Sequence, residues 1–189
     1  MRAPVTSLTL VQAAALFAST GLCAWAAVIA RTRRGVPGGD AFGWMMLAVA
    51  FWSATSALHA LVLDFGTRVL IAKLQYLAVA PIGVLWLLFA TTYGRIEWPM
   101  RRTLLVAVWI VPAITLLLAA TNDTHHWQWS SIEQIDTASG PRLLYHGGPW
   151  YWVHVLYSYA LMLCGTLVLV RGLRRFPPPY RRQTALMIT

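Results

Sequence analysis

Three ionisable side chains, His59, Lys73 and His154, lie inside apolar stretches of the sequence. An ionisable group at membrane depth is costly unless it faces a polar interior, so each of the three is a candidate functional residue. Each lies four residues from the predicted outer end of its helix, about 6 Å below that end. This shared depth predicts that the three side chains meet at one site, where they would hold a ligand by hydrogen bonds and charge.

Each of these residues belongs to a polar or aromatic stripe with helical spacing. Residues at positions i, i+4 and i+7 share one face of a helix. We therefore predict a single pocket in the outer half of the protein. An alternative stays open, in which the lysine extends to the lipid headgroups and the other side chains only bond neighbouring helices. The stripe residues are Trp52, Ser56 and His59, then Lys73 and Tyr76, then His154 and Ser158 with Tyr157 beside them.

A long polar segment, residues 121–152, separates two apolar stretches and is rich in tryptophan and histidine. The period of a β-strand is predicted from Trp127 to Ile135, where one set of side chains alternates with another: Trp127, Trp129, Ser131, Glu133 and Ile135 with Gln128, Ser130, Ile132 and Gln134. A turn-forming run follows at residues 137–141, and residues 142–145 form a second short extended candidate. We predict a small β-hairpin in the outer loop 122–149, lying over the mouth of the pocket. Its aromatic side chains could instead rest on the bilayer surface.

The histidines do not have the spacing of a metal site. His125 and His126 are adjacent, and no cysteine or acidic partner stands at ligand spacing. Haem held between His59 and His154 is an alternative, because their depths match. The sequence also lacks a nucleophile and base motif, a phosphate-binding glycine loop and a kinase signature. We therefore expect no catalysis, no metal and no cofactor in this chain.

The elements that must position these residues are membrane helices. The chain has 189 residues, of which 58% are hydrophobic and 11% are charged, a composition outside the soluble range. A membrane-crossing helix needs about 20 mostly apolar residues. Five such spans are predicted, at about residues 5–30, 41–63, 69–93, 103–121 and 150–170. Pro81 and Pro112 should kink the third and fourth of them.

The chain ends in a short apolar segment, residues 184–189, which is too short to cross a bilayer. We expect it to be the start of a sixth span that has been cut. The predicted fold class is thus an all-α membrane protein. Residues 1–189 are expected to form a single transmembrane domain that is incomplete at its C-terminus.

The distribution of basic residues predicts the orientation. Lysine and arginine accumulate in the cytoplasmic loops of membrane proteins. Eleven of the fifteen lie in residues 31–40, 94–102 and 171–182, so these segments are placed inside. The N-terminus and residues 121–152 are then outside, and the C-terminus is in the cytoplasm. Because the net charge of +9 is spread over short loops between apolar spans, nucleic acid is not an expected partner.

Several stretches of the chain, in this order, resemble the N-terminal seven-transmembrane input domain of bacterial and archaeal histidine kinases, which is also found ahead of diguanylate cyclases. The stretches are FWSATSALHAL, KLQYLAVAPIGVLWLLFATTYG, IVPAITLLLAATNDTHHWQW, GGPWYWVHVLYSYALMLCGTLVLV and YRRQ. The resemblance covers nearly all of the chain from about Ala41 onward. It adds Asn122, His125, Trp129 and Trp150 to the candidate ligand-binding residues, because these match positions of the family.

The resemblance implies a membrane-embedded sensory domain in the plasma membrane of a prokaryote. Such a domain would detect an extracytoplasmic or membrane-dissolved small molecule. It would act on cytoplasmic kinase or cyclase modules, which this chain lacks. The resemblance is also compatible with a homodimer. One position departs from the family, since His59 stands where an acidic residue is expected seven positions after Trp52. The competing interpretation is a small transporter or a quinone- or haem-binding electron-transfer subunit.

Overall fold

A computed structural model describes residues 7–33, 35–94, 102–137 and 140–173. Four helices in it are long and apolar enough to cross a membrane. They are α1 (Ser7–Thr32), α2 (Gly39–Leu61), α3 (Phe65–Tyr93) and α7 (Pro149–Leu173). Three shorter helices, α4 (Arg102–Ala107), α5 (Ile110–Ala120) and α6 (Asn122–His125), lie between α3 and the hairpin strands. The predicted start of a sixth span, residues 184–189, lies outside the described residues.

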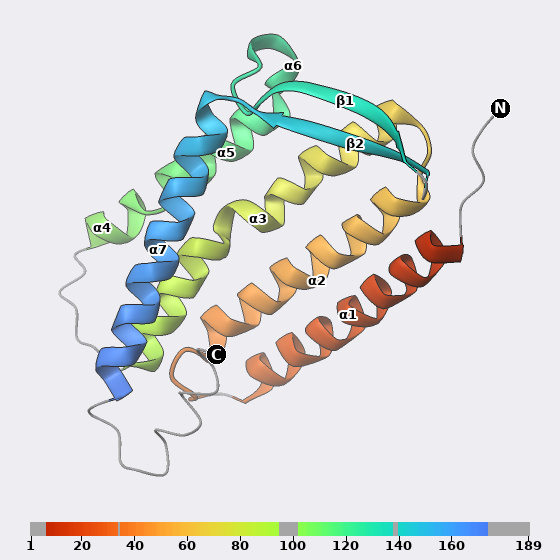
Figure 1. Cartoon of the computed structure of the whole chain (residues 1–189). Coiled ribbons are helices and arrows are strands. Elements are labelled where there is room, and N and C mark those ends of the chain that lie inside the picture. The colour runs from red at the N-terminus through yellow and green to blue at the C-terminus, as the bar shows by residue number, and fades with distance from the viewer. Residues whose placement is uncertain (1–6, 34, 95–101, 138–139, 174–189) are drawn as a thin grey trace.

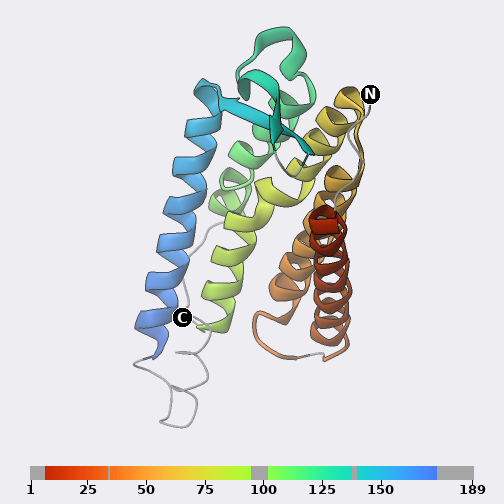
Figure 2. The ribbon, with the colours of Figure 1, turned by 45° about the vertical axis from the view of Figure 1, so that its right-hand side comes forward.

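Helix α3 is the centre of the bundle. It packs against α2 on one side and against α7 and α5 on the other, while α1 packs against α2 (Figure 1). Its N-terminus is capped by Asp64, whose Oδ2 accepts hydrogen bonds from the backbone N–H and the hydroxyl of Thr67, each at 2.7 Å. Figure 2 shows the axis of α3 bending near its middle. Pro81, the seventeenth of its 29 residues, gives the physical reason for this bend.

A small residue lets α3 and α7 approach closely. A Cβ added at Gly83 would lie 3.3 Å from Cα of Ser158 on α7. On the side of this crossing that faces away from the hairpin, the two helices form an apolar core in which Phe89 and Ala90 of α3 meet Val168 and Leu169 of α7. The α3–α7 pair therefore provides a fixed frame for the polar residues in the half of the bundle next to the hairpin.

The predicted hairpin is confirmed. Strands β1 (Trp129–Thr137) and β2 (Gly140–Gly147) pair antiparallel, with Ile132 opposite Tyr145 and with an irregularity between Trp129 and Ser131. Strand β1 has the predicted length but begins and ends two residues later than the pattern Trp127–Ile135, and β2 extends beyond the predicted residues 142–145 at both ends. The hairpin extends from the outer end of α7 across α3 toward the outer end of α2 (Figure 1).

The fourth predicted span is not one continuous helix. Residues 102–120 form α4 and α5, separated by a turn at Val108 and Trp109. Pro112 explains the break, because proline has no N–H to donate to the carbonyl oxygen of Val108, four residues before it. The hydroxyl of Tyr157 on α7 donates to that oxygen instead. The described residues thus contain four helices of membrane-spanning length and a shorter apolar helical stretch at Leu104–Ala120.

Replacing Tyr157 by phenylalanine should leave the Val108 carbonyl without this donor and lower the free energy of unfolding by about 1 kcal/mol. Equilibrium unfolding of the purified protein in mixed detergent micelles measures the change. Tyr159→Phe is the matched control, since Tyr159 lies exposed on another face of α7, and we expect it to leave stability unchanged. Equal effects of the two substitutions would show that the hydroxyl of Tyr157 does not stabilise the break.

Candidate functional site

A polar cavity of about 490 Å³ opens between the hairpin-side halves of α1, α2 and α3 and the tip of the hairpin. Its volume is within the range of small-molecule binding sites. Seven of its eleven lining residues carry a polar or charged side chain, so it differs from a gap that lipid tails would fill. The lining residues that bear on binding are Gln12 from α1, Trp52, Ser56 and His59 from α2, Arg68 and Gln75 from α3, and Arg142 from β2.

Hydrogen bonds join the elements around this cavity. Nε2 of His59 and the hydroxyl of Tyr145 lie 3.1 Å apart, which connects α2 to the hairpin. Nε2 of Gln75 donates to Oγ of Ser56 at 3.1 Å, and Nε of Arg68 donates to the backbone carbonyl of His59 at 3.3 Å, which connects α3 to α2. The wall is therefore made of side chains held in defined positions and not of freely rotating ones.

Arg68 gives the cavity a buried positive charge. It lies in the first turn of α3 and only 5% of its surface is exposed. Arg142 adds a second guanidinium from the exposed strand β2. Among the described residues that line the cavity, none is acidic. The described wall of the cavity therefore includes two guanidinium groups.

Tyr145 occupies the boundary between this cavity and the next group of polar residues. Burial raises the pKa of its phenol above the ordinary value, and the nearby Arg68 cation opposes this shift less strongly. At neutral pH the side chain is thus the neutral phenol. Its ring lies 5.5 Å, between centroids, from that of Trp129. Tyr145 therefore bonds the cavity residue His59 with its hydroxyl and contacts Trp129 of the buried cluster with its ring.

The second group is a packed cluster beneath the end of the hairpin that is joined to α6 and α7. The rings of Tyr76 and Trp129 meet edge to face at 5.3 Å, and the rings of Tyr76 and His154 lie 6.2 Å apart. Nδ1 of His154 lies 3.3 Å from Oγ1 of Thr115, which also accepts a hydrogen bond from the indole of Trp150 at 2.9 Å. Contacts between α3, α5, α7 and β1 thus converge on one layer of buried side chains.

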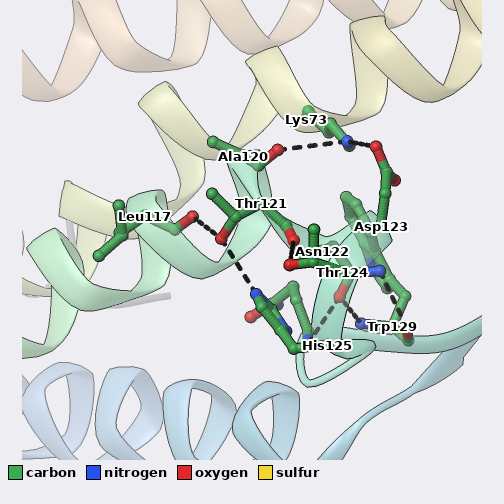
Figure 3. A network of polar contacts seen from close by, with 10 residues as sticks. Lys73, Leu117, Ala120, Thr121, Asn122, Asp123, Thr124, His125 and Trp129 are labelled. Atoms are coloured by element: carbon green, nitrogen blue, oxygen red, sulfur yellow. Dashed lines mark hydrogen bonds and ion pairs between the residues drawn. The ribbon is translucent and has the colours of Figure 1, made fainter.

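Asn122 fixes the start of the hairpin, as Figure 3 shows. Its Oδ1 accepts hydrogen bonds from the backbone N–H groups of Gln128 and Trp129, both at 2.9 Å, and its Nδ2 donates to the carbonyl of Trp129 at 3.0 Å. Gln128 is fully buried, and its Nε2 donates to the hydroxyl of Tyr76 at 2.8 Å. Within the described part of the chain, its Oε1 has no hydrogen-bond partner.

Lys73 and His125 lie at the edge of this cluster (Figure 3). Nζ of Lys73 forms an ion pair with Oδ2 of Asp123 at 2.7 Å and donates to the carbonyl of Ala120 at 3.3 Å. The ring of His125 lies 3.0 Å from Oγ1 of Thr121 and accepts from the backbone N–H of Trp127. These two side chains thus hold the loop between α5 and β1 rather than the cavity wall.

The predicted site residues therefore fall into separate groups. Trp52, Ser56 and His59 line the cavity. Tyr157 bonds the break before α5, and Ser158 lies 3.5 Å from Nε2 of His154. The other predicted residues belong to the buried cluster or its edge: Lys73, Tyr76, Asn122, His125, Trp129, Trp150 and His154. The single pocket expected from helical depth is thus divided by the hairpin and its contacts.

Sequence reasoning missed several cavity residues. Arg68 lies one residue before the predicted third span, whereas the helix begins at Phe65 and places it in the first turn. Gln12 and Gln75 are polar residues inside apolar spans, a signal that could have identified them. Tyr145 and Arg142 could not have been assigned without the register of the hairpin.

A family model described as the N-terminal 7TM region of histidine kinase matches residues 11–189 of the chain. A search of curated proteins found no match, and a search of solved structures found none either.

Proposed function

Because the chain belongs to the family of N-terminal 7TM regions of histidine kinases, and is thus a membrane sensory domain of a signalling protein, we propose that the polar cavity is its input site. A small molecule from outside the cell or dissolved in the membrane enters between α1, α2, α3 and the hairpin. Its binding favours one arrangement of these elements, and cytoplasmic kinase modules respond to that arrangement. A ligand can shift such an equilibrium only by contacting the two arrangements differently.

One observation carries this proposal: the cavity is bounded by four elements, namely three consecutive helices and a strand that follows much later in the chain. A molecule that fills it touches α1, α2, α3 and β2 at the same time. The hydrogen bond between His59 and Tyr145 adds a contact between α2 and the hairpin that a ligand could strengthen or replace. Occupancy can therefore change how α1 and the hairpin pack against the α3–α7 frame.

The distribution of basic residues supports the orientation in which this cavity faces outward and the end of α7 faces the cytoplasm. Arg31 and Arg171 lie in the last turns of α1 and α7, at the end of the bundle opposite to the hairpin. Basic residues accumulate on the cytoplasmic side of a membrane. The domain then receives its signal on the side of the hairpin and transmits it at the opposite end.

A site-directed labelling experiment in the full-length receptor tests the proposal without a known signal. Ser56→Cys is introduced after Cys23 and Cys164 have been replaced by alanine. Intact cells are treated with a charged methanethiosulfonate reagent, and autophosphorylation of the kinase module is measured in isolated membranes. Filling the cavity after the protein has folded should change autophosphorylation by about threefold or more, as expected for a coupling of about 1 kcal/mol.

Thr124→Cys in the same background is the matched control, because Thr124 is exposed on α6, outside the helices of membrane-spanning length and outside the cavity. Labelling there should leave autophosphorylation unchanged. Complete labelling of Ser56→Cys with no change in activity would refute the cavity as the input site. Labelling of this cysteine only after the cells are permeabilised would refute the outward orientation.

A further inference from the structure

An apolar groove of about 410 Å³ lies at the end of the bundle opposite the hairpin, and it shares no lining residue with the polar cavity. Its walls come from α1, α2, α3 and the loop that joins α1 to α2. Trp25 and Ile29 line it from one face of α1, and Arg33 follows four residues later, just beyond the last residue of that helix. Among the eleven described residues that line the groove, Arg33 alone is charged. The groove is therefore an apolar surface with a guanidinium at its end.

Packed aromatic rings give one wall of the groove its shape. The ring of Phe89 lies 5.8 Å from that of Phe42 and 5.4 Å from that of Tyr93, between centroids. Gly38 brings the loop close to these rings, because a Cβ added there would lie 3.1 Å from Cδ2 of Phe89 and 3.3 Å from Cβ of Tyr93. Its φ of +79° is one that glycine adopts without strain. The groove is thus a shaped part of the fold and not the flat face of one helix.

Two arginines at the end of α1 have different surroundings. The stem of Arg31 passes Gly43, where an added Cβ would lie 2.9 Å from its Cγ, and its guanidinium carbon lies 4.5 Å from the ring centroid of Trp44. Arg33 is exposed, and with the described residues its guanidinium forms no ion pair or hydrogen bond. Asp40, the acidic residue closest to it in the sequence, does not line the groove. The groove therefore places an available cation beside an apolar surface.

We propose that this groove binds one anionic phospholipid, with an acyl chain along α1 and the phosphate at Arg33. Basic pockets between membrane helices on the cytoplasmic side bind anionic lipid headgroups, and a guanidinium donates two parallel N–H groups to a phosphate. In the orientation proposed above, the groove opens to the cytoplasmic leaflet. The bound chain contacts α1 and α3 together, whereas the protein itself joins these helices through α2.

Size and charge favour a lipid over other occupants. One turn of a helix with its side chains fills roughly 420–610 Å³, so the groove has room for no more than about one turn of a further helix. An acyl chain is much thinner and can run along the groove. A neutral apolar molecule could also fill it, but would give Arg33 no anionic partner. An anionic phospholipid satisfies both features of the site.

Native mass spectrometry of the full-length receptor in detergent measures the lipid. The probes are phosphatidylglycerol and phosphatidylcholine with identical acyl chains, each added to delipidated receptor. We expect one phosphatidylglycerol per chain to bind at least about fivefold more tightly than phosphatidylcholine, which is the contribution of one basic residue next to an anionic lipid. Glycerol 3-phosphate, which has the phosphate but no acyl chain, should not displace it at equal concentration.

Two pairs of variants locate the site. Arg33→Gln should abolish the preference for phosphatidylglycerol, whereas Arg171→Gln, which removes the same charge from an exposed position on α7 outside the groove, should retain it. Ala26→Phe places a ring in the groove and should weaken binding of phosphatidylglycerol by about fivefold or more. Ala18→Phe, at an exposed position of α1 outside the groove, should leave binding unchanged.

The proposal is overturned if the two lipids bind equally, if Arg33→Gln keeps the preference, or if glycerol 3-phosphate displaces the lipid. It is also overturned if the receptor retains no lipid, as expected when a further segment of the receptor or a second copy covers the groove. Arg33 is exposed, so its substitution tests the site even if Ala26→Phe fails to fold. These measurements use neither kinase activity nor the polar cavity, and their failure is separable from failure of the labelling experiment.

Discussion

Replacing Asn122 by alanine is expected to detach the start of the hairpin from α5 and to lower the free energy of unfolding by about 2–6 kcal/mol. The backbone N–H groups of Gln128 and Trp129 both donate to its Oδ1 in a buried environment. The substitution leaves two buried donors without an acceptor, and each costs about 1–3 kcal/mol. Hydrogen exchange should therefore accelerate in peptides from β1 and β2, and thermal unfolding of the purified protein should begin at a lower temperature.

The adjacent residue supplies the control. Asp123→Asn keeps the size of the side chain and removes the ion pair with Lys73. The Asp123 side chain is 74% exposed, so we expect this change to cost no more than about 1 kcal/mol and to leave hydrogen exchange of the hairpin unchanged. If Asn122→Ala were as mild as Asp123→Asn, the hairpin would have to be held by other contacts.

The second large effect is expected at Gly148, where β2 joins α7. Its N–H donates to the carbonyl of Gln128 at 3.0 Å, and a Cβ there would overlap the carbonyl groups of Trp127 and His126. These atoms belong to the backbone and cannot rotate aside. Gly148→Ala should therefore shift the end of the hairpin away from α7 and destabilise the protein by about 1–3 kcal/mol or more, as overpacking does.

Gly21→Ala is the matched substitution in open space. Nothing lies within 4 Å of a Cβ added at Gly21, which is inside α1. Alanine is a better helix former than glycine, so this change should be neutral or should stabilise by up to about 1 kcal/mol. Parallel unfolding curves of the two variants provide the comparison. A neutral Gly148→Ala would mean that the connection between the hairpin and α7 has room to adjust.

Local patterns were sufficient to predict much of the fold. Long apolar runs predicted the four helices of membrane-spanning length, because length and hydropathy are properties of contiguous residues. The alternation from Trp127 to Ile135 predicted the first strand of the hairpin. Pro112 predicted a disturbance in residues 103–121. Its extent, a break into α4 and α5, depends on a hydrogen bond from Tyr157 that no local pattern reveals.

The grouping of the polar residues was decided by tertiary structure. Depth along each helix placed His59, Lys73 and His154 in one layer, but depth does not say which way a helix is rotated about its axis. In a bilayer the lipid-facing and buried sides of a helix are equally apolar, so sequence periodicity does not fix that rotation. Packing turned His59 toward Tyr145, Lys73 toward Asp123 and His154 toward Thr115.

The sequence by itself therefore determined the four long helices, the existence of the hairpin and the presence of polar residues in the half of the bundle next to the hairpin. Only the tertiary structure brought Arg68 and Arg142 to one cavity, since the two residues lie 74 positions apart in the chain and meet through the register of the hairpin. A cavity is a property of side chains from several elements at once. No periodicity along one of those elements encodes it.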